Sequence, residues 1–286
     1  MRRHGIANVK DSSHAWNDKL SRFRRNARLY LKLQLIQLRT VVEYRADFWI
    51  GILGASLMHG AGLVFITALF GQIDELGGWS AWEVAVLYGL TLIPAGLREL
   101  FSDGPWLLRQ LVNSGEFDRL LVRPVSPAMQ VATRLASIHG VGQLSLGLTL
   151  LILGTARSGM EWTPWKVVYL LVSVLSSLGL LVAIGFLVNM IGFWEPSAQS
   201  AIPTAYAMLI DFAKFPLDIY SNVIKILVTV VAPYAFISYF PALVLLDKDS
   251  AWRWLGFASP LVTLLAVLLT ARLWHKALNR YQGVGH

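Results

Sequence analysis

The chain has 286 residues, of which 55% are hydrophobic and only 15% are charged, and its formal net charge is +8. Apolar runs of about 20 residues, the length that crosses a bilayer as a helix, recur along nearly the whole chain. This composition is typical of an all-α membrane protein with several spans and argues against a large soluble domain. There is no cysteine, which excludes a disulfide framework and a thiolate metal site.

The N-terminal region divides into a tail and a helix. Residues 1–27 are basic and polar, with no apolar core behind the first arginines, so we expect a cytosolic tail and not a signal peptide. Residues 28–47 predict an interfacial elbow helix along the inner leaflet, because a basic stripe runs beside an apolar one. The alternative is that they are the solvated start of the first span. The charged stripe, which is basic except for Glu43, contains Arg25, Arg28, Lys32, Arg39 and Glu43, and the apolar stripe contains Leu31, Leu35, Leu38 and Val42.

Hydropathy predicts six transmembrane helices. They are expected at about 48–70, 82–101, 129–155, 166–194, 198–215 and 255–274. Residues 217–246 form two apolar pieces of about 15 residues, divided by Pro233, and each is too short to cross a core of about 30 Å. We expect these pieces to be re-entrant helices that enter from the outer face. In the competing interpretation 198–215 is interfacial and 222–245 crosses.

Basic residues favour one orientation of these spans. With the N-terminus inside, the cytosolic side carries most of the arginines and lysines, whereas the first outer loop carries Asp74 and Glu75 and no basic residue. Both termini are therefore expected in the cytosol. Beyond the tail, the cytosolic basic residues are Arg109, Arg119, Arg123, Arg272, Lys276 and Arg280.

The sequence lacks the motifs of several chemistries. No glycine-rich loop is followed by Gly-Lys-Ser/Thr, so the chain does not bind ATP by that route. The six histidines are scattered, and no His-Glu-x-x-His helix occurs. We expect no catalytic residue, no metal site, no cofactor bound by this chain and no nucleic-acid partner.

Ionisable residues within or beside the spans are candidates for a translocation path or its gate, because charges are costly to bury in a membrane. The alternative is interfacial solvation or local pairing. Asp211 and Lys214 are one helical turn apart and can pair on one helix face. The candidates are Arg98, Glu99, Glu195, Asp211 and Lys214.

A polar insert at about 102–127 separates the second and third predicted spans. Apolar residues within 107–112 predict a short amphipathic helix, and Gly115 suits its C-terminal cap. Pro124 and Pro127 break helix continuity before the next span.

This insert and its surroundings resemble the membrane subunits of type-2 ABC exporters. The resemblance is strongest to a bacterial branch whose operons usually encode two different permeases and one ATPase. Near the C-terminus, further residues resemble the run in which such permeases place re-entrant outer helices. The residues that carry it are Trp82-Glu83, Tyr88-Gly89, Gly115-Glu116-Phe117-Asp118, Leu121-Val122-Arg123-Pro124, Gln130, Phe215-Pro216-Leu217 and Pro233-Tyr234.

The resemblance implies a single permease domain over 28–286 in the bacterial cytoplasmic membrane. A cytosolic coupling helix within 104–127 would be moved by a dimer of separate ATP-binding cassette ATPase subunits, which would bind ATP and Mg²⁺. A second, non-identical permease would complete the complex. An apolar docking edge would come from Leu107, Leu111, Phe117 and Leu120. Orienting charges would come from Arg109, Glu116, Asp118, Arg119 and Arg123.

We therefore expect the permease subunit of an ATP-driven exporter of an amphipathic substrate. The alternatives are an ordinary cytosolic loop at 104–127 and, for the whole chain, a membrane scaffold or sensor that does not transport. An intramembrane enzyme is a third class, but it would need a nucleophile with a base, or a metal cluster, at one depth.

Overall fold

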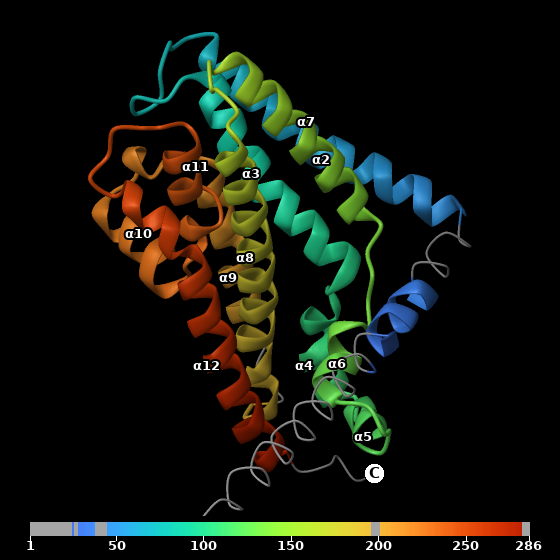
Figure 1. The fold of residues 1–286 in the computed structure, drawn as a ribbon. Coiled ribbons are helices and arrows are strands. Elements are labelled where there is room, and N and C mark those ends of the chain that lie inside the picture. The colour runs from blue at the N-terminus through green and yellow to red at the C-terminus, as the bar shows by residue number, and fades with distance from the viewer. Residues whose placement is uncertain (1–24, 26–27, 38–44, 196–200, 282–286) are drawn as a thin grey trace, which may run out of the picture.

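The structure is a computed structural model, and it describes residues 25, 28–37, 45–195 and 201–281. Among these residues all regular structure is helical. Long helices run along the molecule, and the short helices within residues 104–132 gather at one end (Figure 1). The long helices are α2 (Arg45–Phe70), α3 (Ala81–Phe101), α7 (His139–Arg157), α8 (Pro164–Asn189) and α12 (Ser259–Arg280).

The described residues contain four helical stretches that are long and apolar enough to cross a membrane, or five if one bent pair counts as a span. A membrane protein with several spans is therefore confirmed, whereas the count of six is not. The described part of the predicted fifth span at 198–215 begins at residue 201, and it contains only the short helix α9 (Ala201–Met208) and the 3₁₀ segment η3 (Leu209–Lys214). The four stretches are Ala81–Phe101, His139–Arg157, Pro164–Phe193 and Arg253–Arg280, of which the last two include the 3₁₀ segments η2 (Met190–Phe193) and η7 (Arg253–Ala258).

The N-terminal predictions fall only partly within the described residues. Residues 28–37 are helical and expose Leu31, Leu35 and Ile36, while 38–44 and nearly all of the predicted tail lie outside the described residues. The side chains of Tyr30 and Gln34 both donate hydrogen bonds to the Phe101 carbonyl oxygen, which ties this helix to the end of α3. Its predicted place along the inner leaflet stays a prediction.

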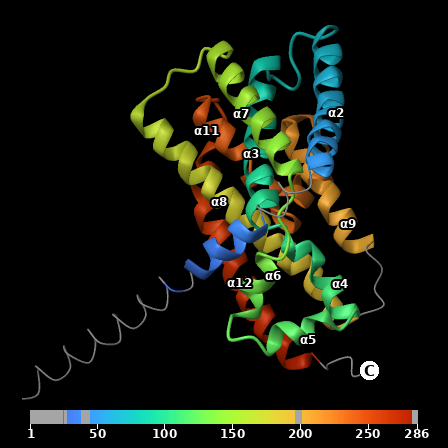
Figure 2. The ribbon, with the colours of Figure 1, turned by 90° about the vertical axis from the view of Figure 1, so that its right-hand side faces the viewer.

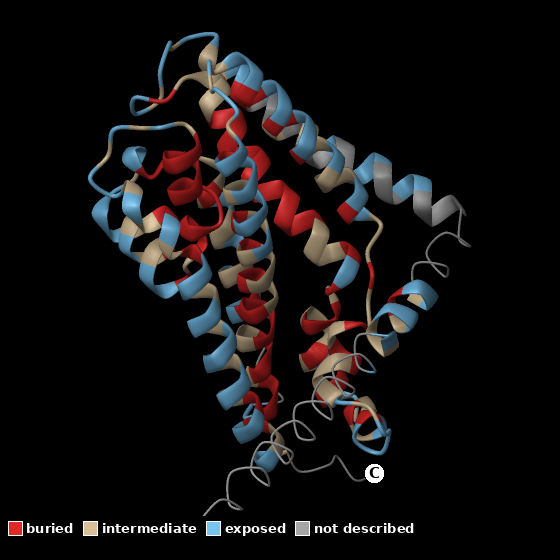
Figure 3. Cartoon of the chain, viewed as in Figure 1, coloured by how far each residue is buried: buried red, intermediate tan, exposed pale blue. Residues whose placement is uncertain are grey.

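The long helix α3 forms the centre of the molecule and α12 its periphery (Figure 3). Within the most apolar window of each, 78% of the α3 stretch is buried but only 11% of the stretch that contains α12. A seam of glycines lets α7 approach α3 closely. A Cβ atom on Gly96 would lie 2.7 Å from the Gly140 carbonyl oxygen, and one on Gly89 would lie 2.8 Å from that of Gly147.

A continuous third span at 129–155 is wrong. The helix α6 (Pro127–Ala132) ends early, residues 133–138 are not helical, and α7 begins at His139. The chain turns here so that α7 can reach the glycine seam, and the Ser137 amide donates to the Glu99 carbonyl oxygen at 2.9 Å. No proline or glycine marks this break between 132 and 139.

The segment between η3 and α12 is broken where the sequence predicts it. The helical stretches Asn222–Val231 and Tyr234–Leu245 meet at 76° on either side of Pro233. Such a bend is typical of a re-entrant pair and also of a broken span, so both predicted interpretations accommodate it. The elements of the segment are η4 (Leu217–Ile219), α10 (Asn222–Ile226), η5 (Leu227–Val231), η6 (Tyr234–Phe236) and α11 (Tyr239–Leu245).

Candidate docking end and candidate gate

The polar insert folds at the end of the molecule where α12 finishes (Figures 1 and 2). It consists of η1 (Gly104–Leu107), α4 (Leu108–Asn113) and α5 (Glu116–Leu121). Gly115 has φ of +72°, a left-handed conformation that glycine adopts without strain, and this residue separates α4 from α5. The C-cap of α4 is Ser114, and Gly115 follows it in the left-handed conformation, so the predicted helix end at Gly115 is confirmed; the insert is a jointed pair of helices, not a single rod.

The helix α5 is anchored by an aromatic side chain. Phe117 is fully buried, and its ring meets three others edge-on, with centroid distances of 5.0 Å to Phe193, 5.1 Å to Tyr281 and 6.2 Å to Trp274. We call these four residues the Phe117 cluster. Edge-to-face packing of this kind adds to the free energy of apolar burial. Because Phe193 ends η2 and the other two lie on or beside the last turns of α12, α5 is fixed to the ends of two long helices.

The helix α4 rests on η2. The backbone of Gly192 comes so close to α4 that an added Cβ atom would lie 2.9 Å from Cγ of Arg109. The apolar face of α4 turns inward onto the same core as the Phe117 cluster. Buried side chains of α4 in that core are Leu108, Leu111 and Val112.

Polar contacts hold the turn that follows α5. The buried side chain of Gln130 donates from Nε2 to the carbonyl oxygens of Leu120 and Val125, both at 2.8 Å. Arg134 forms an ion pair with Glu116 at 2.7 Å. The tip of the insert, residues 119–124, is therefore fixed to α6 by these hydrogen bonds.

The expected apolar docking edge is corrected by this packing. Leu111, Phe117 and Leu120 are buried within the chain and Leu107 is half-buried, because their hydrophobic face covers η2 and α12 and not a partner. At the tip the exposed side chains are different: Val122 is 84% exposed and Leu121 44%. In the sequence, the signal for these exposed residues is the adjacent apolar pair Leu121-Val122, which Arg123 and Pro124 follow.

The predicted orienting charges are distributed unevenly around this tip. Arg119 and Arg123 are exposed, whereas Arg109, Glu116 and Asp118 are partly buried. Arg109 packs against Gly192, and Glu116 is engaged by Arg134. Any role of these five residues toward a partner stays a prediction.

The candidate gate residues divide among separate places. Arg98 forms ion pairs with Asp103 and with Glu99, and the Gln143 amide donates to the Glu99 carboxylate at 2.8 Å. Burial raises the pKa of the Asp103 carboxyl, while the neighbouring Arg98 opposes that shift. This cluster joins the end of α3 to the start of α7 and to the insert.

The second pair is local, as predicted. Asp211 and Lys214 form an ion pair of 2.6 Å within η3, and the Lys214 ammonium also lies 5.3 Å from the ring centroid of Tyr88. Tyr88 and Arg98 are ten residues apart on α3, which corresponds to about 15 Å of helix rise. Glu195 is exposed and lies just after η2, apart from both groups. The structure therefore does not bring the five candidates together into one polar line.

Within the described residues there is no group of three or more histidine and acidic side chains that could hold a metal ion. Membrane-length apolar helices around a buried centre, with a folded polar insert at one end, define a helical membrane protein with several spans. The model of the ABC-2 family transporter proteins matches residues 56–285, and the chain belongs to this family. Membership implies a membrane permease that works with an ABC ATPase. Comparison with curated proteins and with solved structures gives no match.

Proposed function

We propose that this chain is the permease subunit of an ABC exporter that moves an amphipathic substrate out of the cytosol. A dimer of separate ATPase subunits would bind ATP and Mg²⁺ and drive it, and a second, non-identical permease would complete the path. The distribution of basic residues supports a bacterial cytoplasmic membrane with both termini and the insert in the cytosol. Six spans would be α2, the four candidate stretches and one crossing within residues 201–245.

The observation that carries this proposal is the Phe117 cluster. A partner can drive a permease only if the element that it touches is firmly joined to the spans. Phe117 is fully buried between η2 and the end of α12, so α5 cannot shift without moving at least one of them. Close packing transmits displacement, which an exposed loop would absorb.

The docking surface would be the tip of the insert. It presents an apolar pair, Leu121 and Val122, between the exposed arginines Arg119 and Arg123. Apolar side chains ringed by charge are typical of an interface in which the centre gives affinity and the rim gives orientation. The buried Leu111, Phe117 and Leu120 would act as the anchor behind this surface.

Negative charge placed at the tip tests the proposal. The double variant Arg119→Glu, Val122→Asp is co-expressed with a candidate ABC ATPase subunit from the same organism, and co-purification and ATPase activity are measured. We expect the permease to insert normally and the ATPase to be lost from it. The matched control is Glu161→Lys, a charge reversal at an exposed residue of the loop before α8.

Wild-type binding and transport by the double variant would refute the tip as the docking surface. If the wild-type chain itself retained no ATPase, the non-transporting scaffold or sensor would replace the exporter. The two outcomes are distinct, because the first concerns the surface and the second the complex.

A further inference from the structure

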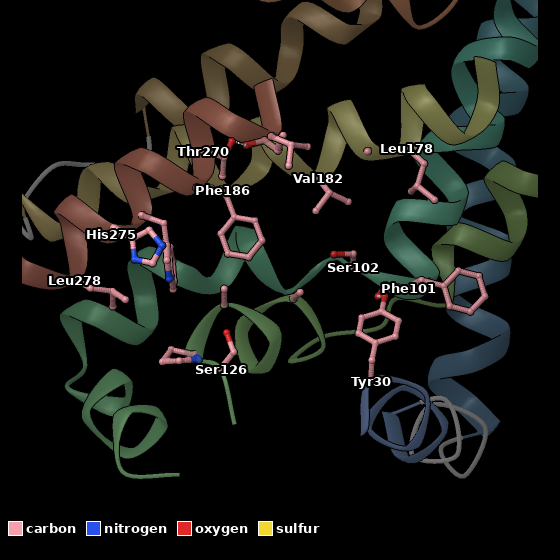
Figure 4. A pocket seen from close by; sticks show the side chains of 18 residues that line it. Tyr30, Phe101, Ser102, Ser126, Leu178, Val182, Phe186, Thr270, His275 and Leu278 are labelled. Carbon is pink, nitrogen blue, oxygen red and sulfur yellow. Dashed lines mark hydrogen bonds between the residues drawn. The ribbon is translucent and has the colours of Figure 1, made fainter. Parts of the chain in front are cut away.

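A cavity of about 710 Å³ lies beside the docking end, and the docking function does not account for it. It is bounded by helix 28–37, the end of α3, α6, α8 and α12, and Figure 4 shows Tyr30 facing Phe186 and His275 across it. We call it the inner cavity. Its volume is in the range of pockets that hold small organic ligands, about 300–1,000 Å³.

The wall of the inner cavity is apolar. Two of its hydroxyl groups are engaged with backbone: Tyr30 donates to the Phe101 carbonyl oxygen at 2.6 Å, and Thr270 donates to that of Ala266 at 2.7 Å. The remaining surface is mostly hydrocarbon and aromatic, including Val182, Phe186 and Trp274. A polar ligand would find few partners here, whereas a hydrocarbon chain would lose nothing by leaving the bilayer.

The inner cavity opens sideways toward the surroundings of the helices. Several residues that line it are themselves exposed, among them Phe101 at 39% and Val267 at 43%. Val267 lies on α12, whose apolar side chains at Leu261, Leu264 and Leu268 are also exposed, as expected for a helix that faces lipid. The opening is therefore continuous with a lipid-facing surface.

The two helices at this opening carry charge of one sign. Helix 28–37 contains Arg28 and Lys32, both exposed, and residues 270–280 of α12 contain exposed basic residues, while neither stretch contains an acidic residue. Long basic side chains reach headgroups at a membrane surface and are attracted to anionic lipid. The basic residues of the α12 stretch are Arg272, Lys276 and Arg280.

We propose that the inner cavity holds an acyl chain of an anionic phospholipid from the leaflet around the docking end. The chain would lie against Phe186 and Trp274, whose rings pack 5.4 Å apart, and the headgroup would meet the basic helices. Trp274 also belongs to the Phe117 cluster, so the lipid would fill the space behind the anchor of α5. The inference does not require the ATPase. Only the identification of this leaflet as the cytosolic one rests on the proposed function.

Photo-crosslinking tests this site on the full chain without an ATPase. The protein is placed in phosphatidylcholine vesicles that contain phosphatidylglycerol with a diazirine in its acyl chain, and labelled peptides are mapped. We expect label on residues 178–186 and 267–278. The variant Ala271→Trp should reduce the label several-fold, because an indole at this exposed lining position fills the mouth. The matched control Leu265→Trp, exposed on the same helix but outside the lining, should not.

Label spread evenly along exposed α12 and equal in the two variants would overturn the site. Equal label from a phosphatidylcholine probe with the same diazirine would overturn the preference for an anionic headgroup. Label that appears only after residues 1–24 are removed would make that segment the occupant in place of lipid. None of these results depends on whether the tip binds an ATPase.

Discussion

The two ends of the helices are held by contacts of different chemistry. At the docking end the contacts are aromatic and buried, as in the Phe117 cluster. At the opposite end, around α11, buried aromatic packing such as that of Phe236 against Phe240 is supplemented by charged contacts, several of which are partly exposed. There the Lys248 ammonium forms an ion pair of 2.8 Å with Glu83, donates to the Gly78 carbonyl oxygen and lies 5.0 Å from the ring centroid of Trp79.

Two further polar ties extend this second end. The Asp218 carboxylate accepts hydrogen bonds from the Trp79 indole and the Tyr239 hydroxyl, each at 3.0 Å. Lys166, whose side chain is buried, forms an ion pair of 2.6 Å with Asp247. Together these bonds join the α2–α3 loop, the bent segment and the start of α8.

The difference indicates how each end can respond to force. Polar partners near water exchange protein contacts for solvent at a modest net cost. Buried aromatic rings cannot do so without exposing apolar surface. We therefore expect the polar ties of the opposite end to break more readily than the Phe117 cluster, and four experiments test this.

The largest effect is expected from Phe117→Ala. Removing a fully buried aromatic side chain leaves a cavity and should lower the free energy of unfolding by about 3–5 kcal/mol. Thermal unfolding in detergent measures this loss. The control Leu121→Ala, at the exposed tip, should change stability by about 0.5 kcal/mol or less. An equal loss in the two variants would show that the anchor is elsewhere.

A smaller loss is expected from Lys248→Met at the opposite end. The change removes the ion pair with Glu83 and the contact with Trp79, at a cost of about 1–3 kcal/mol. Protease cleavage in the loop at 246–252 should accelerate. Asp249→Asn, exposed in the same loop, is the matched control. Unchanged cleavage of Lys248→Met would show that the Lys248–Glu83 ion pair does not stabilise this end.

The ion pair between Glu116 and Arg134 should contribute still less to the free energy of unfolding. Both side chains are partly exposed, at 45% and 36%, so the pair is expected to stabilise the fold by no more than about 1 kcal/mol. A double-mutant cycle with Glu116→Gln and Arg134→Gln isolates this coupling energy. A value as large as the loss in Phe117→Ala would contradict the division between buried anchor and polar tie.

The smallest expected effect is the pH dependence of the stability that Asp247 contributes at the opposite end. A hydrogen bond from Lys166, with the charges of Lys166 and Arg253, lowers the pKa of the Asp247 carboxyl. A lowered pKa stabilises the folded state above the unfolded value of about 3.9, and this contribution disappears as pH falls through the folded pKa. The stability advantage of wild type over Asp247→Asn should therefore be present at pH 5 and vanish in stronger acid. A stability advantage that does not change with pH would refute a stabilising role of the Asp247 charge.

The sequence predicts the features that depend on local chemistry. The bounds of α3 follow from an apolar run and from the capping box of Ser80 and Glu83 at its start. Gly115 and Pro233 mark breaks because their own backbones favour them. The family resemblance, which rests on residues around Gly115, agrees with the family that the chain belongs to.

The features that depend on distant partners could not be predicted. An apolar stripe shows that Phe117 will be buried, but not whether a partner protein or Tyr281 buries it. The break at 133–138 has no local signal, because it arises where α7 must reach Gly96. The inner cavity is likewise invisible, since its walls come from five segments spread over the chain.

The joint at Gly115 has a mechanical consequence. On one side of it α4 rests on η2 at the end of α8, and on the other α5 is held by Trp274 and Tyr281 at the end of α12. Because Phe117 of α5 also packs on Phe193 of η2, a push on residues 119–123 would reach α8 and α12 together. The insert would therefore couple these two helices, so that a push on its tip displaces both ends at once.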